Sequence, residues 1–509
     1  ISKMKKILFL SSLIFFLLWP GLSPLVLAFQ QKETYPKLAN YYLQPLIPAE
    51  HYNDLARYDL LILDVDSPDD LRSYLKDHNQ DINLFAYIPS QGINSEGMNS
   101  WGNWRKLTYR QADENNWWLY DSQGHQVSFS DVWPNIKFID PGQGWSDFLS
   151  DKIQQEVEGN EWQGVFYDMV FANLSWLNDG DLDLNQDSQA DQIKEVNAYW
   201  QRHMTDLLKK TNQKIEPNPL VANVDIASYY TNSLNGVMME NFPADWLGED
   251  GWSILMDQYL NKLPQENNQP LVYVVNVNTK NKGPMTSFQE MRFGLASTLL
   301  GQGYFSFDYG DENHGQVWWY DEYEVKLGRP TSDPYNLLNS SSDIKPGLWR
   351  RDFENGSVMV NSTNQKQTHV FKNEVFKKIN GSQDRRVNNG VKINWLELKA
   401  QDGIVLLKNK EEIQNKAFTN GAFVRVLDWT GWPQQNGFFA FENTAPSRTQ
   451  VLKTNGMDLI GQQGKVYLNQ RFFSEYERFQ GDVFIALGGI EKDKDLKVIT
   501  APGFGGGPH

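Results

Sequence analysis

The chain has no cysteine among its 509 residues, which excludes disulfides, thiolate nucleophiles and cysteine-ligated zinc. Its seven histidines, at positions 51, 78, 125, 203, 314, 369 and 509, show no His-x-His or His-x-x-x-His spacing, so a histidine-ligated metallohydrolase is disfavoured. No Gly-x-Ser-x-Gly elbow is present, which disfavours an α/β-hydrolase. No Gly-x-Gly-x-x-Gly follows the first expected strand, so we expect no dinucleotide site.

Basic residues are outnumbered, with 47 Lys and Arg against 63 Asp and Glu, and the net charge is −16. Nucleic acids and anionic membranes are therefore disfavoured as partners, because phosphate groups are bound by basic surfaces. Tryptophan (18) and tyrosine (22) are plentiful. They fit either large cores or surfaces that stack on the apolar faces of sugar rings.

The first 28 residues have the pattern of a signal peptide. Three lysines lie within the first six residues, an apolar run spans residues 7–18, and small residues precede a cleavage position at Ala28. A run of this length is too short for a comfortable membrane span. We expect export to the cell surface or beyond, starting from Met4; an uncleaved anchor, the only expected membrane contact, is the alternative.

Strands and helices alternate from about residue 50, which predicts an α/β fold with a parallel sheet. Eight strands over some 270 residues match a (β/α)₈ barrel, assigned here to residues 29–335, with residues 29–50 as a leader segment. A doubly wound open sheet is the alternative. The expected strands are Tyr58–Asp64, Asn83–Pro89, Ile136–Asp140, Gly164–Val170, Pro219–Val224, Gly236–Glu240, Leu271–Val277 and Gly303–Asp308.

Short alternating strands replace this pattern after residue 335. Residues 336–412 predict a small β-sandwich, with a structural role favoured over glycan binding. Residues 413–509 are also β-rich and contain Phe423–Trp429 and a glycine-rich end, Gly503–His509. This region resembles FG-GAP-type repeats and is expected to be an incomplete repeat domain. Lysines in the segment 489–495 weaken the expectation of calcium there.

Two expected strands end in carboxylates with the chemistry of glycosidases. Such enzymes use two carboxyl groups, ~5–5.5 Å apart when retaining and ~6.5–9.5 Å apart when inverting. Asp168 ends the fourth expected strand and Glu240 the sixth, and a barrel presents such residues at its C-terminal mouth. We predict Asp168 as nucleophile or base and Glu240 as proton donor, with the order of these two roles open.

Other polar residues near strand ends are expected to bind substrate. Asp64 and Asp66 fit this role or that of a loop cap. Tyr87 is placed to orient a carboxylate. Asp140 is the alternative candidate for a third carboxylate at the mouth. The expected substrate-binding set is Asp64, Asp66, Tyr87, Asp140, Asn276, Asp308 and Asp311.

The segment Trp318–Tyr323 follows the last expected strand and includes Glu322. Its aromatic run predicts either a sugar platform or packing between the barrel and the β-sandwich.

An acidic loop, Asp179–Asp191, follows the fourth expected strand. Asp183, Asn185, Asp187 and Asp191 occupy positions 1, 3, 5 and 9 of a calcium-loop pattern, while Ser188 and Lys194 depart from it. The loop is therefore either a solvated acidic surface or a structural calcium site. No cofactor is expected to be required for the reaction.

Three segments resemble one bacterial family. Trp117–Gly124, Gly164–Asp168 and Trp319–Gly328 are similar to segments of glycoside hydrolase-like family 15, whose barrel is related to that of endo-α-1,4-polygalactosaminidases. The resemblance covers roughly residues 40–410. It implies a glycosidase barrel with carboxylates on the fourth and sixth strands, which correspond to Asp168 and Glu240.

We therefore expect an exported glycoside hydrolase that acts on a polysaccharide, such as an exopolysaccharide or a cell-surface glycan. The alternative from another class is a non-catalytic carbohydrate-binding or adhesion protein with a degenerate barrel. A transglycosylase is a third reading. The separation of the Asp168 and Glu240 carboxyl groups distinguishes catalysis from a degenerate barrel, since only catalysis requires them to face each other.

Overall fold

The computed structural model describes residues 29–409, apart from 45, 96–101, 131–132, 225–228, 340 and 342, together with seven strands between residues 422 and 502. The chain divides into two compact units, residues 1–408 and 409–509. In the described part, no helix is long and apolar enough to cross a membrane. The expected signal peptide, residues 1–28, lies outside the described residues.

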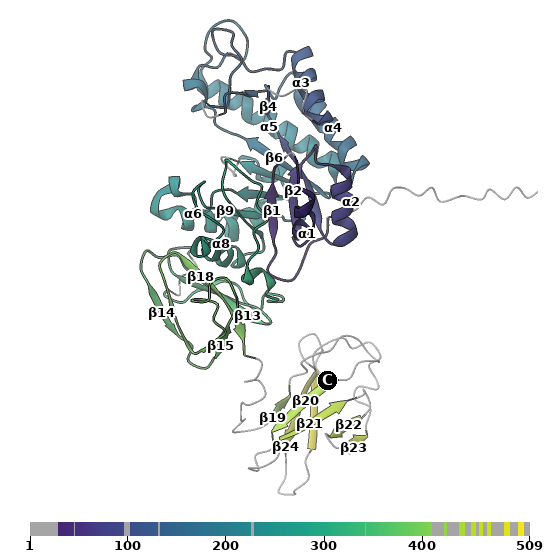
Figure 1. Cartoon of the computed structure of the whole chain (residues 1–509), viewed down its shortest axis with the longest axis vertical. Coiled ribbons are helices and arrows are strands. Elements are labelled where there is room, and N and C mark those ends of the chain that lie inside the picture. Colours follow the sequence, from purple (N-terminus) through teal and green to yellow (C-terminus); the bar gives the residue numbers. More distant parts are fainter. Residues whose placement is uncertain are drawn as a thin grey trace, which may run out of the picture. The chain divides into compact units, whose positions relative to one another are not determined.

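An eight-stranded parallel sheet forms the centre of the first unit (Figure 1). Leu38 bridges Phe305 in parallel, and the amide of Phe305 donates to the Lys37 carbonyl at 2.9 Å, which brings the first and last strands together. The (β/α)₈ barrel is thereby confirmed over the open sheet. In spatial order the strands are β1 (Ala39–Tyr42), β2 (Leu60–Asp64), β3 (Asn83–Pro89), β6 (Gly164–Val170), β7 (Leu220–Val224), β8 (Gly236–Met239), β9 (Val274–Asn278) and β10 (Tyr304–Asp308).

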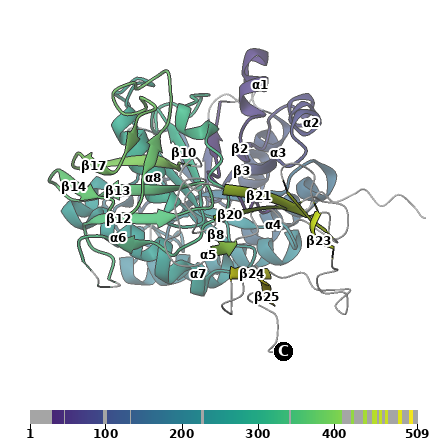
Figure 2. The ribbon, with the colours of Figure 1, turned by 90° about the horizontal axis from the view of Figure 1, so that it is seen from below.

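Helices surround these strands (Figure 2). They are α1 (Tyr52–Leu55), α2 (Asp69–His78), α3 (Asn103–Glu114), α4 (Trp145–Gly159), α5 (Ile193–Ile215), α6 (Gly251–Asp257), α7 (Leu263–Glu266) and α8 (Phe288–Leu299). Short 3₁₀ turns occupy Ala49–His51, Leu177–Gly180, Thr231–Ser233, Asp245–Asp250 and Asp321–Glu324, and a π-helical turn occupies Gln258–Lys262.

The strand prediction differs from the structure at two places: one expected strand is not in the barrel, and one barrel strand was missed. The leader segment contains β1, which the sequence Ala-Asn-Tyr-Tyr conceals because it has no apolar run. Ile136–Asp140 is not a barrel strand, since β5 (Ile136–Phe138) pairs antiparallel with β4 (Gly92–Asn94) in an insertion between β3 and β6. One strand was missed and one was added, so Asp168 still lies on the fourth barrel strand.

Close pairing of β3 with β6 leaves no room for a strand between them. Phe85 lies opposite Gly164 in the parallel register. A Cβ atom at position 164 would lie 2.5 Å from the Phe85 ring, so this strand start accepts only glycine without a shift of the ring. The insertion of β4, β5 and α3 therefore lies outside the barrel sheet (Figure 1).

Alternate residues of the strands fill the barrel interior. Ile62, Phe85, Phe166 and Met238 belong to one buried cluster inside the sheet, whereas neighbours such as Leu63 pack outward against the helices. Side chains of a strand alternate between faces with a period of two. Residues 87, 168 and 240 therefore lie on the inner face, one step nearer the mouth than Phe85, Phe166 and Met238.

Antiparallel sheets follow the barrel within the first unit. Six strands form one sheet and β14 pairs with β17 in a second, two-stranded sheet, and both sheets contribute to a shared core that includes Met359, Leu396 and Leu406. The strands are β11 (Tyr335–Asn336), β12 (Leu348–Asp352), β13 (Gly356–Asn361), β14 (Gln367–Val370), β15 (Phe376–Lys378), β16 (Lys392–Ile393), β17 (Trp395–Leu398) and β18 (Asp402–Lys408).

The second unit contains a three-stranded and a four-stranded antiparallel sheet. Its strands are β19 (Ala422–Val424), β20 (Gly437–Glu442), β21 (Thr449–Thr454), β22 (Asp458–Gly461), β23 (Val466–Asn469), β24 (Val483–Gly488) and β25 (Lys497–Pro502). The glycine-rich end 503–509 and the segment 489–495 lie outside the described residues. The FG-GAP-like repeat remains a prediction.

Helix α8 joins the barrel to the first set of antiparallel strands. Its residues Met291–Leu299 are all buried, which is typical of a helix covered on every side. Arg292 donates from Nε and Nη2 to Asp402, at 3.0 and 3.1 Å, and from Nη1 to Asp384 at 2.7 Å. This buried ion network therefore ties the helix to the β-strands that cover it.

We expect the substitution Arg292→Met to lower the free energy of unfolding by about 3–5 kcal/mol, because it leaves two buried carboxylates without their cation. Adding Asp384→Asn and Asp402→Asn should restore part of the loss, since the unpaired charges are then removed. Urea denaturation of the single and triple variants measures both effects. Equal stability of the two variants would contradict this account.

Candidate active site

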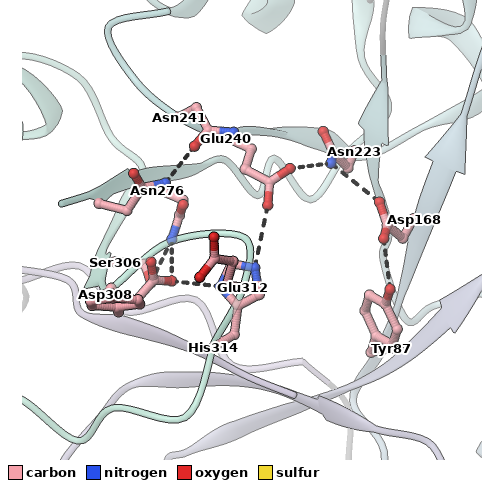
Figure 3. A network of polar contacts seen from close by, with 12 residues as sticks. Tyr87, Asp168, Asn223, Glu240, Asn241, Asn276, Ser306, Asp308, Glu312 and His314 are labelled. Atoms are coloured by element: carbon pink, nitrogen blue, oxygen red, sulfur yellow. Dashed lines mark hydrogen bonds and ion pairs between the residues drawn. The ribbon is translucent and has the colours of Figure 1, made fainter. Parts of the chain in front are cut away.

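Asp168 lies on β6 and Glu240 directly follows β8, at the same end of the barrel, and Asn223 of the intervening strand β7 lies between the two carboxyl groups (Figure 3). The Asn223 amide nitrogen donates to Asp168 Oδ1 at 3.2 Å and to Glu240 Oε2 at 2.7 Å. Since both oxygens lie around one nitrogen, they are no more than about 6 Å apart. The Glu240 side chain is 20% exposed, so the pair of carboxyl groups is accessible from solvent.

Tyr87 fixes the other oxygen of Asp168. Its hydroxyl donates to Asp168 Oδ2 at 2.6 Å (Figure 3). Asp168 Oδ1 also accepts the backbone amide of Met169 at 2.8 Å. Both oxygens of Asp168 therefore accept hydrogen bonds, and Tyr87 contacts a carboxylate, as expected from its position at the end of β3.

The backbone turns sharply just after each carboxylate. Met169 has a φ of 61° and Asn241 a φ of 56°, a left-handed conformation that non-glycine residues rarely adopt. The register between β6 and β7 shifts between Tyr167 and Val170. These bends let Asp168 and Glu240 leave the regular sheet at its mouth, and such conformations gather at functional sites.

Glu240 is in an environment that retains its proton. Burial raises the pKa of Glu240, the negative charge of Asp168 raises it further and the imidazole of His314 opposes the change, leaving a pKa of about 8. Two carboxylates this close do not both ionise easily. Glu240 is therefore the carboxyl group of the pair suited to donate a proton near neutral pH.

A second polar group reaches Glu240 from the loop after β10. His314 places Nε2 3.8 Å from Glu240 Oε1, and its Nδ1 lies 2.9 Å from Asp308 Oδ2. Asn276 Nδ2 donates to the same Asp308 oxygen at 3.0 Å. Of the residues expected at the mouth, Asp308 thus contacts His314 directly, and Asn276 contacts Asp308.

Sequence reasoning missed two residues of this network. Asn223 lies two positions after the inward-facing Val221 on β7. Because strand side chains alternate with a period of two, the sequence would have predicted that Asn223 also faces inward. His314 lies in a loop and has no metal-ligand spacing, so only the folded chain reveals its position.

Glu240, Asp311 and His314 form a cluster in which one ligand atom from each lies within 4.8 Å of the others. It is the one such group of three acidic or histidine side chains found among the described residues. These are the residues of the mouth that could hold a cation. Asp311, expected at the mouth, is an exposed member of this cluster.

Asp64, Asp66 and Asp140 make local contacts instead. Asp64 pairs with Arg105 and accepts the amide of Asp66. Asp66 accepts the backbone amides of residues 104 and 105 at the start of α3. Asp140, outside the barrel sheet, accepts hydrogen bonds from Gly142, Gln143 and Tyr199. Substrate binding by these three carboxylates remains a prediction.

The acidic loop after β6 is held by its own hydrogen bonds. Asp183 is buried and accepts the amides of Asp187 and Ser188 at 3.1 and 2.8 Å. Asp191 accepts the amide of Leu184 and the side chain of Asn185. These bonds organise the loop, and calcium binding at Asp183, Asn185, Asp187 and Asp191 stays a prediction.

The aromatic run after β10 packs within the protein. Trp319 stacks beneath Arg57, whose guanidinium lies 3.7 Å from the ring centroid, and Tyr320 is buried. Glu322 is buried and accepts from the Asn388 side chain at 2.8 Å. Glu322 therefore joins the barrel to the antiparallel region, whereas Tyr320 packs against Phe307 and donates to the Met285 carbonyl, and neither forms an exposed sugar platform.

The raised pKa of Glu240 predicts a pH dependence of stability. Between about pH 4.5 and pH 8 the folded protein retains a proton that the unfolded chain has released. The stability that this proton contributes is present below pH 4.5 and is lost as the pH rises toward 8. As the pH rises from 4.5 to 8, the free energy of unfolding of the wild type, measured by urea denaturation, should fall relative to that of Glu240→Gln. A difference between the two proteins that does not change with pH would contradict the prediction.

Solved structures of low sequence identity are similar to parts of this chain. The glycoside hydrolase domain of PelA from Pseudomonas aeruginosa is 15% identical, with 54% of this chain and 95% of that chain covered and a TM-score of 0.36. Ega3 from Aspergillus fumigatus, in complex with galactosamine, is 12% identical, with 57% and 96% covered and a TM-score of 0.35. Amy13B from Eubacterium rectale is 10% identical, with 75% and 96% covered and a TM-score of 0.44.

No curated protein matches the sequence. A family description, by contrast, matches residues 76–357, which include β3 and all barrel strands after it. This range is more than half of the chain, and it agrees with the resemblance carried by the Trp117, Gly164 and Trp319 segments. The chain belongs to hypothetical glycosyl hydrolase family 15.

Proposed function

We propose that this protein hydrolyses glycosidic bonds of a polysaccharide, with Asp168 as nucleophile and Glu240 as acid and base. The observation that carries the proposal is the single amide nitrogen of Asn223, which contacts both carboxylates. Two carboxyl groups this close at an accessible mouth are what a glycosidase requires. A degenerate, purely binding barrel has no need of such a pair.

The environments of the two groups divide the roles. Glu240 retains its proton and would donate it to the oxygen of the leaving sugar as the bond breaks. Asp168, held by Tyr87 and Asn223, would attack the anomeric carbon and form a glycosyl ester. Glu240, now a carboxylate, would take a proton from the water that cleaves this ester.

Exposed aromatic side chains support a carbohydrate substrate. Trp176 lies after β6, Tyr229 after β7 and Trp246 after β8, and their exposures are 45%, 50% and 69%. These loops follow the three strands that carry Asp168, Asn223 and Glu240. Loops at the C-terminal ends of barrel strands surround the site, so these rings are available to stack on a polymer.

Export is part of the proposal, because a polysaccharide outside the cell requires an enzyme there. The basic and apolar pattern of residues 1–28 supports it. The acidic groups at the mouth, including Asp308 and Asp311, favour a neutral or cationic glycan over an anionic one.

We expect Asp168→Asn and Glu240→Gln each to lower kcat/KM by at least about 100-fold, within the range for removal of a positioned acid or base. The assay is release of reducing ends from a glycan panel that includes galactosamine-containing polymers. Asp206→Asn on α5, which removes a carboxylate paired with Lys210, is the matched control. Undiminished activity in Asp168→Asn would remove this residue from the mechanism.

The close approach of the pair predicts retention of the anomeric configuration. The nearest oxygens of Asp168 and Glu240 are no more than about 6 Å apart, below the ~6.5–9.5 Å of inverting enzymes. Proton NMR of the first product formed should therefore show the anomer of the substrate. An initial product of opposite configuration would make Asp168 a base that activates water.

A further inference from the structure

Two adjacent tyrosines on β1 face opposite sides of the barrel wall. Tyr41 belongs to the buried cluster inside the sheet, whereas Tyr42 belongs to the cluster formed with the surrounding helices, as expected from the alternation of strand side chains. The Tyr42 hydroxyl lies 2.9 Å from His51 Nδ1 and is hydrogen-bonded to it. Tyr41 is only 2% exposed, yet its hydroxyl has no hydrogen-bond partner among the residues that the structure describes.

An unpaired hydroxyl inside a protein costs stability. Buried polar groups are almost always hydrogen-bonded, because an unpaired donor loses its hydration and gains nothing in exchange. Some side-chain atoms of the described residues are fully enclosed without a partner, such as Trp200 Nε1, but the Tyr41 oxygen is not one of them. The Tyr41 hydroxyl therefore borders the open mouth, where a bound molecule can reach it.

Neighbouring rings place Tyr41 beside the two carboxyl groups of the candidate site. Its ring centroid lies 6.0 Å from that of Tyr87 and 4.5 Å from that of His314. Tyr87 contacts Asp168, and His314 faces Glu240 (Figure 3). Tyr41 therefore packs against one neighbour of each carboxyl group.

Strand β1 lies across the barrel from β7. In the closed sheet β2, β3 and β6 separate the two strands on one side, and β8, β9 and β10 separate them on the other. Asn223 of β7 lies between the two carboxyl groups, so Tyr41 approaches the same space from the opposite wall. A sugar bound there would have Asn223 on one side and Tyr41 on the other.

Other amide and hydroxyl donors described at the mouth are already committed to protein oxygens. Tyr87 and Asn223 donate to the two carboxyl groups of the pair, and Asn276 donates to Asp308. The Tyr41 hydroxyl keeps its proton near neutral pH, as phenols do, and has one hydrogen bond to donate. The ring and hydroxyl oxygens of a sugar are acceptors for such a bond.

We propose that the Tyr41 hydroxyl binds the substrate, by donating a hydrogen bond to an oxygen of the sugar held between Asp168 and Glu240. This inference deepens the proposed function and rests on it. The hydroxyl is unpaired in the free protein and becomes paired only when a sugar is bound. A sugar ring fixed by this contact presents its anomeric carbon to Asp168 in one orientation, which favours the reaction.

Phenylalanine substitutions separate the roles of the two hydroxyls. Tyr41→Phe keeps the ring packing and removes an oxygen that has no protein partner, so the urea midpoint should stay the same or rise. Tyr42→Phe, the matched control on the same strand, removes the bond to His51 and should lower the midpoint. A loss of stability in Tyr41→Phe as large as that in Tyr42→Phe would assign its hydroxyl to the fold and overturn the proposal.

Tyrosine NMR tests sugar binding without catalysis. With Cζ of the tyrosines labelled with ¹³C, the signals of Tyr41 and Tyr42 are assigned by their disappearance in Tyr41→Phe and Tyr42→Phe. Glucose, galactose and galactosamine are the probes, and we expect at least one of them to shift the Tyr41 signal saturably and to leave the Tyr42 signal in place. That sugar should bind Tyr41→Phe about 2- to 12-fold more weakly, the effect of one uncharged hydrogen bond. A Tyr41 signal that no probe moves would overturn the proposal.

Kinetics with an active glycan distinguish this inference from the proposed function. Tyr41→Phe should lower kcat/KM by about 2- to 12-fold, and Tyr42→Phe should leave it unchanged. An active wild type whose kcat/KM is unaltered in Tyr41→Phe would overturn the role of Tyr41 and leave the proposed hydrolysis intact. A wild type whose Tyr41 signal responds to a sugar, but which cleaves no glycan, would support the contact with Tyr41 and count against the proposed function.

Discussion

Two carboxyl groups that share one amide nitrogen cannot both be charged at low cost, and this constraint organises the mouth of the barrel. Asp168 has a hydroxyl and two amides to stabilise its negative charge. Glu240 has one amide and a histidine held at a distance. Burial and the neighbouring carboxylate raise the pKa of Glu240 to about 8, so we propose that Glu240 is the group of the pair that carries a proton near neutral pH.

The barrel produces this arrangement through the period of its strands. A strand that packs Phe85, Phe166 or Met238 inside the sheet must place the residue two positions later on the same face. At the mouth, where the interior opens, those positions hold polar groups. The bends at Met169 and Asn241 then adjust the aim of the two carboxylates.

Much of the fold and the central pair could be predicted from the sequence, because apolar strands ending in carboxylates are local signals. Partners of a strand are not local, so Ile136–Phe138 looked like a barrel strand although it pairs with Gly92–Asn94. Strand β1 gave no signal because Asn40 and two tyrosines replace an apolar run.

Individual side-chain partners were harder still to predict. Asp140 is bound by Tyr199, which lies 59 positions later on α5, and no local pattern announces this contact. Asp66 faces the start of α3 for the same reason. His314 reaches Glu240 from a loop 74 positions further along the chain, and only closure of the barrel brings the two together.

The burial of α8 on all sides has a consequence for the limits of the domain. In a bare barrel the outer face of this helix would meet water, but here it is covered by strands as late as β18 and bound through Arg292 to Asp384 and Asp402. A cut at residue 335 would leave apolar surface and an unmatched cation on the barrel. The barrel and the antiparallel strands up to residue 408 therefore belong to one folding unit.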